Sequence, residues 1–464
     1  MQTIIFLTVL LPLKTLTTLQ PQNLITSQPH ILMNYYSTNK QVADVALEEA
    51  VVTGLAADRG LYMPRMLKPL PQEFYDHIHE MSFQEIAFRV AEAFFGEDVP
   101  ADKLRAIVDD TLQFDTPVVP VSENIYALEL FHGPTLAFKD VGGRFMARLL
   151  SHFIQGDAEK QVNVLVATSG DTGSAVANGF LGVPGIHVYV FYPKGMVSEI
   201  QEKQFTTLGQ NITAIEVDGC FDDCQALVKA AFMDEELNKR MKLTSANSIN
   251  IARFLPQAFY YFNAYAQLKR MGKEQEMVVA VPSGNFGNLT AGLFGKHMGL
   301  PIKRFIAANN SNDIVYKYLQ TGKYEPRASV CTIANAMDVG NPSNFARILD
   351  FYGESHEAIC KDLSGAAYSD AQIEACVKQV WAEEGYLLDP HGACGYQALK
   401  EGLKDGEVGV FLETAHPAKF KDTIERIIGE QIEIPAKLQE FMKGEKQSIP
   451  MAPTLDALKQ YLLG

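Results

Sequence analysis

The sequence alternates short apolar runs with segments of helical spacing, and this alternation limits the possible folds more than any other feature. Runs with the length and composition of buried strands lie at 163–168, 186–193 and 212–217. In the segments between them, apolar residues recur at the spacing of a helix packed against a core. Because strands that alternate with helices assemble into parallel sheets, we predict an α/β fold with helices on both faces of the sheet.

The same alternation returns in the second half of the chain. Three strand-like runs follow a long helical stretch, at 277–282, 304–309 and 408–413. We therefore expect two open parallel sheets, one around 131–250 and one around 255–430. Two short strands are expected within 118–131, and the last thirty residues are expected to form a polar linker and one short helix.

The region before these sheets has a different pattern. Helical spacing at 42–55 ends at Gly54, and Ser82 with Glu85 forms a capping-box pattern ahead of a second helix. A chain of 464 residues is long enough for about three units. We predict three of them: a mainly helical unit at 33–115, a smaller α/β domain at 116–252, and a larger α/β domain with a tail at 253–464.

Residues 1–32 differ in composition from the rest of the chain. Their apolar run, at 4–13, is too short to span a bilayer, and it lacks the preceding basic residue and the small-residue cleavage site of a signal peptide. We expect translation to start at Met33 and the leader to lie outside the native structure; export is the alternative. No other segment has the length and hydropathy of a transmembrane helix.

Charge and cysteine content restrict the function. A net charge of -15 disfavours nucleic acids and anionic membranes as partners, so an anionic ligand needs local donors. Of the six cysteines, only Cys220 and Cys224 are close in sequence, and no matching His or Cys pair accompanies them. We therefore expect no metal site and a cytoplasmic location, where scattered cysteines stay reduced.

Lys139 is the first residue with an unusual setting. It lies in HGPTLAFKDVGGRF (132–145), between an aromatic residue and a pair of glycines. A lysine held partly dry can lose its proton near neutral pH and form a Schiff base with a carbonyl. The alternative is an ordinary lysine in a surface loop.

Two loops between a strand and a helix have the composition of anion sites. SGNFGN (283–288) combines two glycines with a helix amino terminus, which suits a phosphate, although it is neither a Walker loop nor G-x-G-x-x-G. SGDTG (169–173) occupies the same place in the other sheet and suits a carboxylate or a second phosphate. Asp171 within it is either a helix cap or a group that orients a hydroxyl or amine. The alternative for each loop is a plain turn.

Two further segments supply polar groups near strand ends. ANSINIAR (246–253) places Ser248 and Arg253 ahead of a long helix, where the arginine binds an anion or forms a salt bridge. Thr414 follows a buried strand, at the sheet edge where open α/β sheets bind ligands. His391 and His416 lie close to such ends, and for both we favour a structural role over a catalytic one.

Taken together, five segments resemble the threonine synthase family, pyridoxal-phosphate enzymes of the tryptophan-synthase β-like fold (fold type II). They are HGPTLAFKD, ATSGDTGSA, SANSINIAR, VPSGNFGN and TAHPAKF, which occur in the family's order. The region around LEEAVVTGLAADRGLYMP is similar to the bacterial and fungal class. The resemblance implies two α/β domains with pyridoxal 5'-phosphate in the cleft between them.

The resemblance also implies a role for each residue. Lys139 would hold the cofactor covalently and carry protons. The cofactor would further contact Asp171, Gly284, Asn285, Phe286, Gly287, Asn288 and Thr414. The substrate would contact Ser169, Thr172, Ser174, Ser248, Arg253 and Asn288. Many relatives of the fold carry Asn at the position of Asp171, so the contact of this carboxylate is open, because it would repel a substrate carboxylate.

The implied reaction converts O-phospho-L-homoserine and water to L-threonine and phosphate by γ-elimination and β-addition, the last step of threonine biosynthesis. Two alternatives stay open: a phospholyase or dehydratase of the same fold that gives 2-oxobutyrate, and an inactive binding homologue. The implied partner is the small-molecule substrate, and the protein is expected to be a monomer or homodimer.

Overall fold

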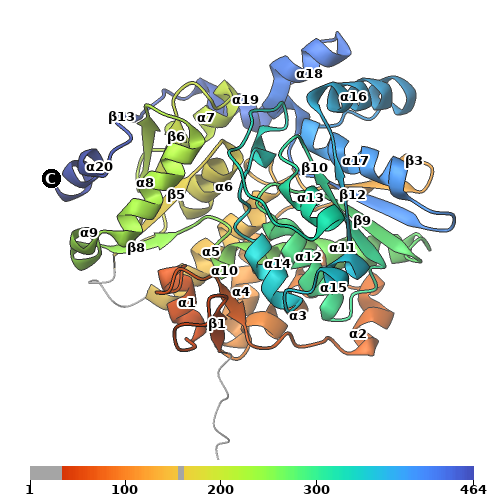
Figure 1. The fold of residues 1–464 in the computed structure, drawn as a ribbon, viewed down its shortest axis with the longest axis horizontal. Coiled ribbons are helices and arrows are strands. Elements are labelled where there is room, and N and C mark those ends of the chain that lie inside the picture. Colours follow the sequence, from red (N-terminus) through yellow and green to blue (C-terminus); the bar gives the residue numbers. More distant parts are fainter. Residues whose placement is uncertain (1–33, 155–160) are drawn as a thin grey trace, which may run out of the picture. The chain divides into compact units, whose positions relative to one another are not determined.

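The computed structural model describes residues 34–154 and 161–464. The described residues belong to one compact unit that spans Leu32–Gly464 (Figure 1). The expectation about the leader at 1–32 lies outside the described residues. Within the described part, no helix is long and apolar enough to cross a membrane.

The larger sheet has six strands in the order β11-β10-β9-β12-β4-β3. The strands are β3 (Val118–Ser122), β4 (Ile125–Glu129), β9 (Met277–Pro282), β10 (Arg304–Asn309), β11 (Leu363–Ala367) and β12 (Val408–Glu413). All neighbours pair in parallel except β3 and β4, which form an antiparallel pair at one edge. The predicted parallel sheet in the second half of the chain is confirmed.

The smaller sheet has five strands in the order β13-β7-β6-β5-β8, all parallel. They are β5 (Val162–Ala167), β6 (Ile186–Pro193), β7 (Ile212–Val217), β8 (Lys242–Ser245) and β13 (Ile449–Met451). The side chains of β5 alternate between two cores, with Val164 in one and Leu165 in the other. Each face is therefore covered by helices, which confirms the predicted α/β class.

Strand membership differs from the sequence expectation in two places. The antiparallel pair at 118–129 belongs to the larger sheet, because β4 pairs with β12 and not with a strand of 131–250. The carboxyl-terminal tail is more than a linker and a helix, because β13 pairs with β7 of the smaller sheet. A three-residue edge strand that contains a proline carries no periodic signal, and pairing partners so distant in sequence leave no local pattern.

The amino-terminal region is mainly helical, as predicted, and also contains a two-stranded antiparallel ribbon, β1 (Tyr35–Ser37) with β2 (Tyr62–Pro64). Its helices are α1 (Leu47–Thr53), α2 (Gln72–His77), the 3-10 helix η1 (Ile78–Glu80), α3 (Phe83–Phe95) and α4 (Ala101–Thr111). Gly54 ends α1 with a left-handed φ of 71°, which glycine adopts without strain. Ser82 caps α3 by accepting the N–H of Glu85.

The remaining helices surround the two sheets. Those from the middle of the chain are α5 (Lys139–Ile154), α6 (Asp171–Phe180), α7 (Glu199–Thr206), α8 (Phe221–Met233), α9 (Glu235–Arg240), α10 (Ile251–Phe254), η2 (Leu255–Gln257), α11 (Ala258–Arg270) and α12 (Gly287–His297). Those from the last third are α13 (Ile314–Thr321), η3 (Asn335–Met337), α14 (Phe345–Phe351), α15 (His356–Asp362), α16 (Asp370–Glu384), α17 (Pro390–Gly402), η4 (Pro417–Phe420), α18 (Lys421–Ile428), α19 (Ala436–Lys443) and α20 (Leu455–Leu463).

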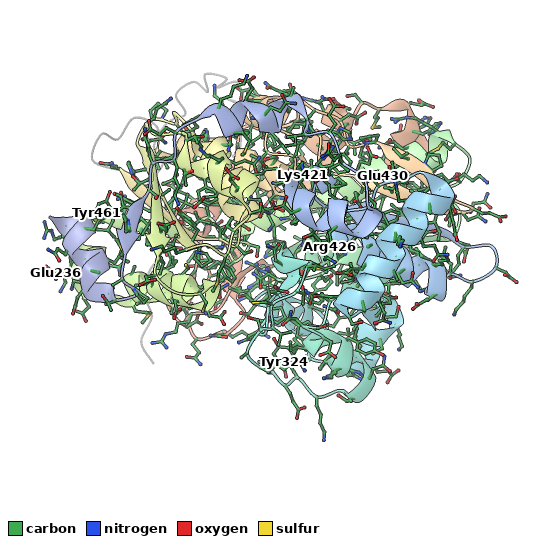
Figure 2. All side chains as sticks on the ribbon, turned by 90° about the horizontal axis from the view of Figure 1, so that it is seen from above. Glu236, Tyr324, Lys421, Arg426, Glu430 and Tyr461 are labelled. Atoms are coloured by element: carbon green, nitrogen blue, oxygen red, sulfur yellow. The ribbon has the colours of Figure 1, made fainter. Side chains whose placement is uncertain are left out.

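The long helix expected after the segment 246–253 is interrupted. Pro256 lies within a 3-10 turn between α10 and α11, because a proline has no N–H to continue the α-helical bonding. The final helix α20 lies beside α9, and Figure 2 labels Tyr461 of α20 and Glu236 of α9. Lys459 of α20 forms an ion pair of 2.8 Å with Glu236. The carboxyl-terminal tail is therefore attached to the smaller sheet by a strand and by a helix.

Candidate active site

A cavity lies where the carboxyl ends of strands from both sheets meet. It is lined by segments that follow β5, β8, β9 and β12, and by the first residue of α5. Ligands bind at this edge of open parallel sheets because loops and helix amino termini converge there. Of the residues proposed from the sequence, the lining includes Lys139, Ser169, Thr172, Ser248, Arg253, Gly284, Asn285, Phe286, Gly287, Asn288 and Thr414.

Lys139 is fixed in position by its backbone. The N–H of Phe138 donates to the carbonyl of Thr414 at 2.8 Å, and the hydroxyl of Tyr260 donates to the carbonyl of Phe138. The carbonyl of Lys139 accepts from Nη1 of Arg253 at 3.1 Å. The amine is thus presented by the rigid start of a helix and not by a surface loop, which was the alternative.

The amine of Lys139 has a reduced proton affinity. Its pKa is lowered to about 8, mainly by burial; the charge of Asp171 opposes this shift, and the charges of Arg253 and Lys419 add to it. An amine with a pKa near 8 is partly neutral at physiological pH, so it can act as a nucleophile and as a base.

The loop at 283–288 has the geometry of a phosphate cradle. Phe286 precedes α12 with a left-handed φ of 62°, so the chain turns sharply into the helix. A Cβ at Gly284 would lie 2.7 Å from the carbonyl oxygen of Ala336, and a Cβ at Gly287 would lie 3.1 Å from Cβ of Ser248. The turn excludes a Cβ at residue 284 and crowds one at residue 287, and it presents the helix amino terminus to the cavity.

Ser248 is oriented to donate its proton into the cavity. Its Oγ accepts from Nδ2 of Asn285 at 2.8 Å and from Nδ2 of Asn344 at 3.0 Å. Because both amides donate to the oxygen, the hydroxyl proton is left to point towards another acceptor. Such a hydroxyl suits an anion in the cavity.

Arg253 is almost fully buried, with 2% of its surface exposed. Its Nε donates to the carbonyl of Ala246 at 2.7 Å and its Nη1 to the carbonyl of Lys139. Burial lowers its pKa to about 10. Among residues 34–154 and 161–464, none forms an ion pair with Arg253. The salt bridge that the sequence left open is therefore not found in the described part of the chain, and the guanidinium lines the cavity without a carboxylate partner.

Asn288 and Thr414 both line the cavity, but the side chain of Asn288 is already hydrogen-bonded within its own loop. The side-chain amide of Asn288 donates to the carbonyl of Pro282 at 2.9 Å, and its Oδ1 accepts from the N–H of Leu289 at 2.9 Å. Asn288 therefore mainly shapes the loop. Thr414 follows β12 directly and contributes a short hydroxyl at the strand end, as expected from the sequence.

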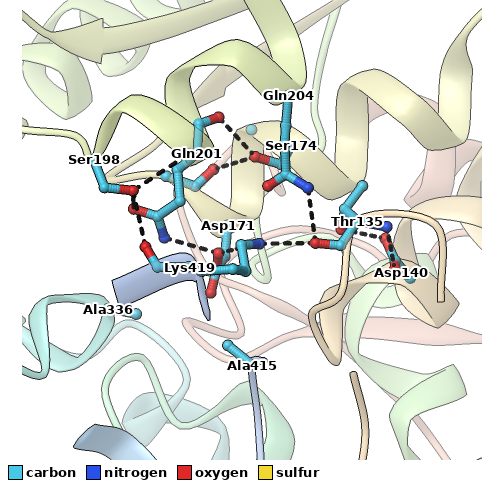
Figure 3. Close-up of polar contacts among 12 residues, drawn as sticks. Thr135, Asp140, Asp171, Ser174, Ser198, Gln201, Gln204, Ala336, Ala415 and Lys419 are labelled. Carbon is cyan, nitrogen blue, oxygen red and sulfur yellow. Dashed lines mark hydrogen bonds and ion pairs between the residues drawn. The ribbon is translucent and has the colours of Figure 1, made fainter. Parts of the chain in front are cut away.

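Asp171 and Ser174 are the two proposed site residues that do not line the cavity. Asp171 forms a buried ion pair of 2.6 Å with Lys419 (Figure 3). Burial by itself would raise its pKa, but the charges of Lys419 and Lys139 lower it to about 2. The hydroxyl of Ser174 lies 3.1 Å from the carbonyl of Gly170, the residue that precedes α6. Both side chains are bonded to protein groups outside the cavity lining, and the expectation that they contact ligands stays a prediction.

Both histidines act as hydrogen-bond acceptors. His391 lines the cavity, with Nδ1 at 2.6 Å from Asp389 Oδ1 and Nε2 accepting the N–H of Ala336 at 3.1 Å. In His416, Nδ1 accepts the N–H of Ala418 at 3.1 Å, and burial lowers its pKa to about 4. These contacts support the structural role favoured for both residues.

We therefore predict that His416→Asn keeps kcat/KM within about threefold of the unsubstituted enzyme, because asparagine also caps a helical turn. The lost ring contact with Phe131, at 5.2 Å between centroids, should lower stability by about 1 kcal/mol. Steady-state kinetics from pH 6 to 9 measures kcat/KM, and thermal unfolding measures the change in stability. A hundredfold loss of kcat would instead make His416 a proton-transfer group.

Several residues around the cavity had no signal in the sequence. Arg347 of α14 is fully buried and donates to the carbonyls of Ser248 and Ile249, so it supports the segment that carries Ser248. The lining further includes Phe138, Phe221, Gln225, Asn247, Gln257, Asn335 and Asp338. Among the described residues, no cluster of three or more His, Cys, Asp or Glu is arranged to hold a metal ion.

The chain matches three protein families. Residues 110–414 match the family described as pyridoxal-phosphate dependent enzyme. Residues 34–112 match the family described as threonine synthase N terminus, and residues 392–462 the family described as threonine synthase, C-terminal.

Individual relatives agree with these families. The threonine synthase of Serratia marcescens is 44% identical over 93% of this chain and 99% of its own length. The crystal structure of threonine synthase from Escherichia coli is similar with a TM-score of 0.87, at 43% identity over 93% of this chain and 99% of its own. The pyridoxal-phosphate-bound threonine synthase of Brucella melitensis has a TM-score of 0.86, at 34% identity over 93% of this chain and 98% of its own.

Proposed function

The chain belongs to the threonine synthase family of pyridoxal-phosphate-dependent enzymes, and on this basis we propose that the cavity around Lys139 is its active site. The chain is a pyridoxal-phosphate-dependent lyase that converts O-phospho-L-homoserine and water to L-threonine and phosphate. The observation that carries the site assignment is a partly neutral buried amine, at Lys139, in one cavity with a glycine-lined helix amino terminus.

The residues present fit the cofactor. Lys139 would hold it covalently, and the turn at 284–288 would hold its phosphate, because this turn lines the cavity at the amino terminus of α12. Thr414 would face the ring nitrogen with a neutral hydroxyl, which leaves the ring less firmly protonated than a carboxylate would. When bound, pyridoxal phosphate supplies an electron sink for the electrons released at the substrate's α-carbon.

The remaining steps depend on the chain's own groups. Once the substrate's amino group has replaced it on the cofactor, the freed Nζ of Lys139 would remove the proton from Cα of the substrate. The same amine would carry protons from Cβ and to Cγ as the phosphate leaves and water adds at Cβ, and would finally return a proton to Cα. A single amine can serve both directions of transfer because its pKa of about 8 lies near the working pH. The fixed backbone around Lys139 keeps the amine within reach of these adjacent carbons.

The substrate's two anionic groups would bind at different walls of the cavity. The Ser248 hydroxyl and the buried Arg253 guanidinium would bind the phosphate, because both can donate and neither is held by a carboxylate. The backbone and hydroxyls of Ser169 and Thr172, at the amino terminus of α6, would bind the carboxylate. Asn288 contributes by shaping the loop that would lie between the cofactor and the substrate.

Product analysis tests the activity against its nearest alternatives. We expect the purified protein, supplied with O-phospho-L-homoserine, to release phosphate and L-threonine in equal amounts. A phospholyase of the same fold would release phosphate with 2-oxobutyrate, and an inactive homologue would release neither. Chromatographic analysis of the amino acid and the keto acid separates the three outcomes, and equimolar 2-oxobutyrate would overturn the assignment.

The domain limits at 33–115, 116–252 and 253–464 stay a prediction. Residues from both α/β parts contribute to the larger sheet, since β4 pairs with β12. The monomeric or homodimeric state and the absence of nucleic-acid partners also stay predictions. The cytoplasmic location is a proposal that the biosynthetic activity supports.

A further inference from the structure

A buried ion pair connects the two sheets beside Lys139. Lys419 lies in η4, after β12 of the larger sheet, and Asp171 begins α6, after β5 of the smaller sheet. Nζ of Lys419 is 2.6 Å from Oδ1 of Asp171, and the side chains are 0% and 3% exposed (Figure 3). A buried charge without its partner is strongly unfavourable, so each member requires the other.

Polar neighbours fix the geometry of this pair. Nε2 of Gln201 donates to Oδ1 of Asp171 at 2.9 Å. The hydroxyl of Ser198 lies 3.1 Å from Oε1 of Gln201 and 3.1 Å from the carbonyl oxygen of Lys419. Gly170 has a φ of 138°, and a Cβ there would lie 2.6 Å from the Gln201 side chain. The loop before α6 is therefore packed around the pair.

The pair is also bonded to the segment that carries Lys139. Nζ of Lys419 donates to the carbonyl of Thr135 at 2.9 Å. The N–H and hydroxyl of Thr135 donate to the carboxylate of Asp140, at 2.9 and 2.6 Å. Asp140 adjoins Lys139 in α5, so the position of Lys419 determines the path of the chain on both sides of the reactive lysine.

The charges facing Lys139 come from three other elements. Asp171 of α6 raises the pKa of Lys139, whereas Arg253 of α10 and Lys419 of η4 lower it. Asp140 lies on the same helix as Lys139, and Asp338 and His391 line the cavity from the larger sheet's side. Without Lys419, Asp171 would be an uncompensated anion behind the loop that holds Ser169 and Thr172.

We propose that Lys419 is a positioning residue for the reaction: it neutralises Asp171, so that the loop at 169–173 can accept the substrate carboxylate, and it fixes the chain around Lys139. The proposal rests on the proposed function of the cavity. Lys419 touches neither ligand and acts through Asp171 and Thr135.

The test compares Lys419→Met, Asp171→Asn and the double variant in the full-length protein freed of cofactor with hydroxylamine. The rate of Lys139 labelling by acetic anhydride, followed by peptide mass spectrometry, gives the pH midpoint of its amine, expected near 8 without substitution. Lys419→Met should raise the midpoint by about 1 pH unit, because Asp171 then faces Lys139 unpaired. Asp171→Asn should lower it by about as much, and the double variant should return close to the original value.

Kinetics of the cofactor-loaded proteins supply a second readout. Lys419→Met should raise KM for O-phospho-L-homoserine about tenfold, the double variant should recover most of this loss, and cofactor Kd should change little in either. Lys437→Met is the matched control, because this exposed lysine donates to the carbonyl of His132 at 2.9 Å and has no part in the pair. It should leave the midpoint and KM unchanged.

Opposite shifts that cancel in the double variant would support the proposal. Equal labelling midpoints in all the variants, or midpoints shifted in the same direction by both single substitutions, would overturn it. A purely structural role of Lys419 gives no reason for the two single substitutions to shift the midpoint in opposite directions. Should Lys419→Met fail to fold, Asp171→Asn and the double variant still decide the question. The labelling midpoint does not depend on which product the enzyme forms, so this result is independent of the product analysis.

Discussion

Lys139→Ala is expected to lower kcat by about 10⁴-fold or more, because one amine provides both the covalent attachment of the cofactor and the proton transfers. Phosphate release from O-phospho-L-homoserine, measured with excess cofactor, gives the rate. The variant should still bind pyridoxal phosphate through the cradle at 284–288, but more weakly and without the absorbance of a lysine-bound cofactor.

The loss should not come from misfolding. Burial lowers the pKa of Lys139 from 10.5 to about 8, so the folded protein disfavours the charged amine. Below pH 8 the amine is charged in the folded and in the unfolded state, so burial of this charge lowers the free energy of unfolding. Between about pH 8 and 10.5 only the unfolded chain keeps the proton, so the free energy of unfolding rises with pH. Cofactor-free Lys139→Ala should therefore melt no lower than the cofactor-free parent at pH 7. A lower melting temperature with activity partly kept would contradict this account of Lys139.

The second large effect is expected at Arg253. Arg253→Ala removes a cation that lines the cavity, and it should raise KM for O-phospho-L-homoserine by about 10²-fold, the size of one or two charge-assisted hydrogen bonds to phosphate. Cofactor Kd should change only a few-fold, because the cradle lies on another loop. Steady-state kinetics and a spectroscopic cofactor titration measure the two quantities.

The contacts of Arg253 with Ala246 and Lys139 make a matched comparison necessary, because its removal also weakens this backbone. Arg347→Met supplies it: Arg347 is equally buried and holds the carbonyls of Ser248 and Ile249, but it does not line the cavity. Both variants should lose stability, but only Arg253→Ala should show the large increase in KM. Equal increases in both would mean that Arg253 supports the segment and does not bind the substrate phosphate.

Features that depend on neighbouring residues could be predicted from the sequence. The buried parallel strands have continuous apolar runs, and the loops after β5 and β9 have the glycines and hydroxyls of anion sites. These two loops follow strands of different sheets, so their meeting in one cleft was implied by the family resemblance and not by the local pattern. The cavity accordingly contains Lys139, Ser248 and Thr414, which are far apart in the chain.

Features that depend on distant pairs could not be predicted in this way. Lys419 and Asp171 are in contact but lie far apart in the sequence, with most strands of the two sheets between them. A lone lysine in a helical turn has no sequence pattern that marks it as buried. The pairing of β4 with β12 and of β13 with β7 depends on tertiary packing in the same way. The sequence left the contact of Asp171 open, and its partner, Lys419, could only be found in the structure.

Borohydride reduction of the cofactor-loaded protein, followed by peptide mapping, tests the central claim most directly. The reduction should discharge the yellow colour and leave one pyridoxyl group on the peptide that contains Lys139. Lys139→Ala carries no lysine at this position and should not be labelled there. A pyridoxyl group on a different lysine, or none on an enzyme that still forms threonine, would contradict the assignment of this cavity as the active site.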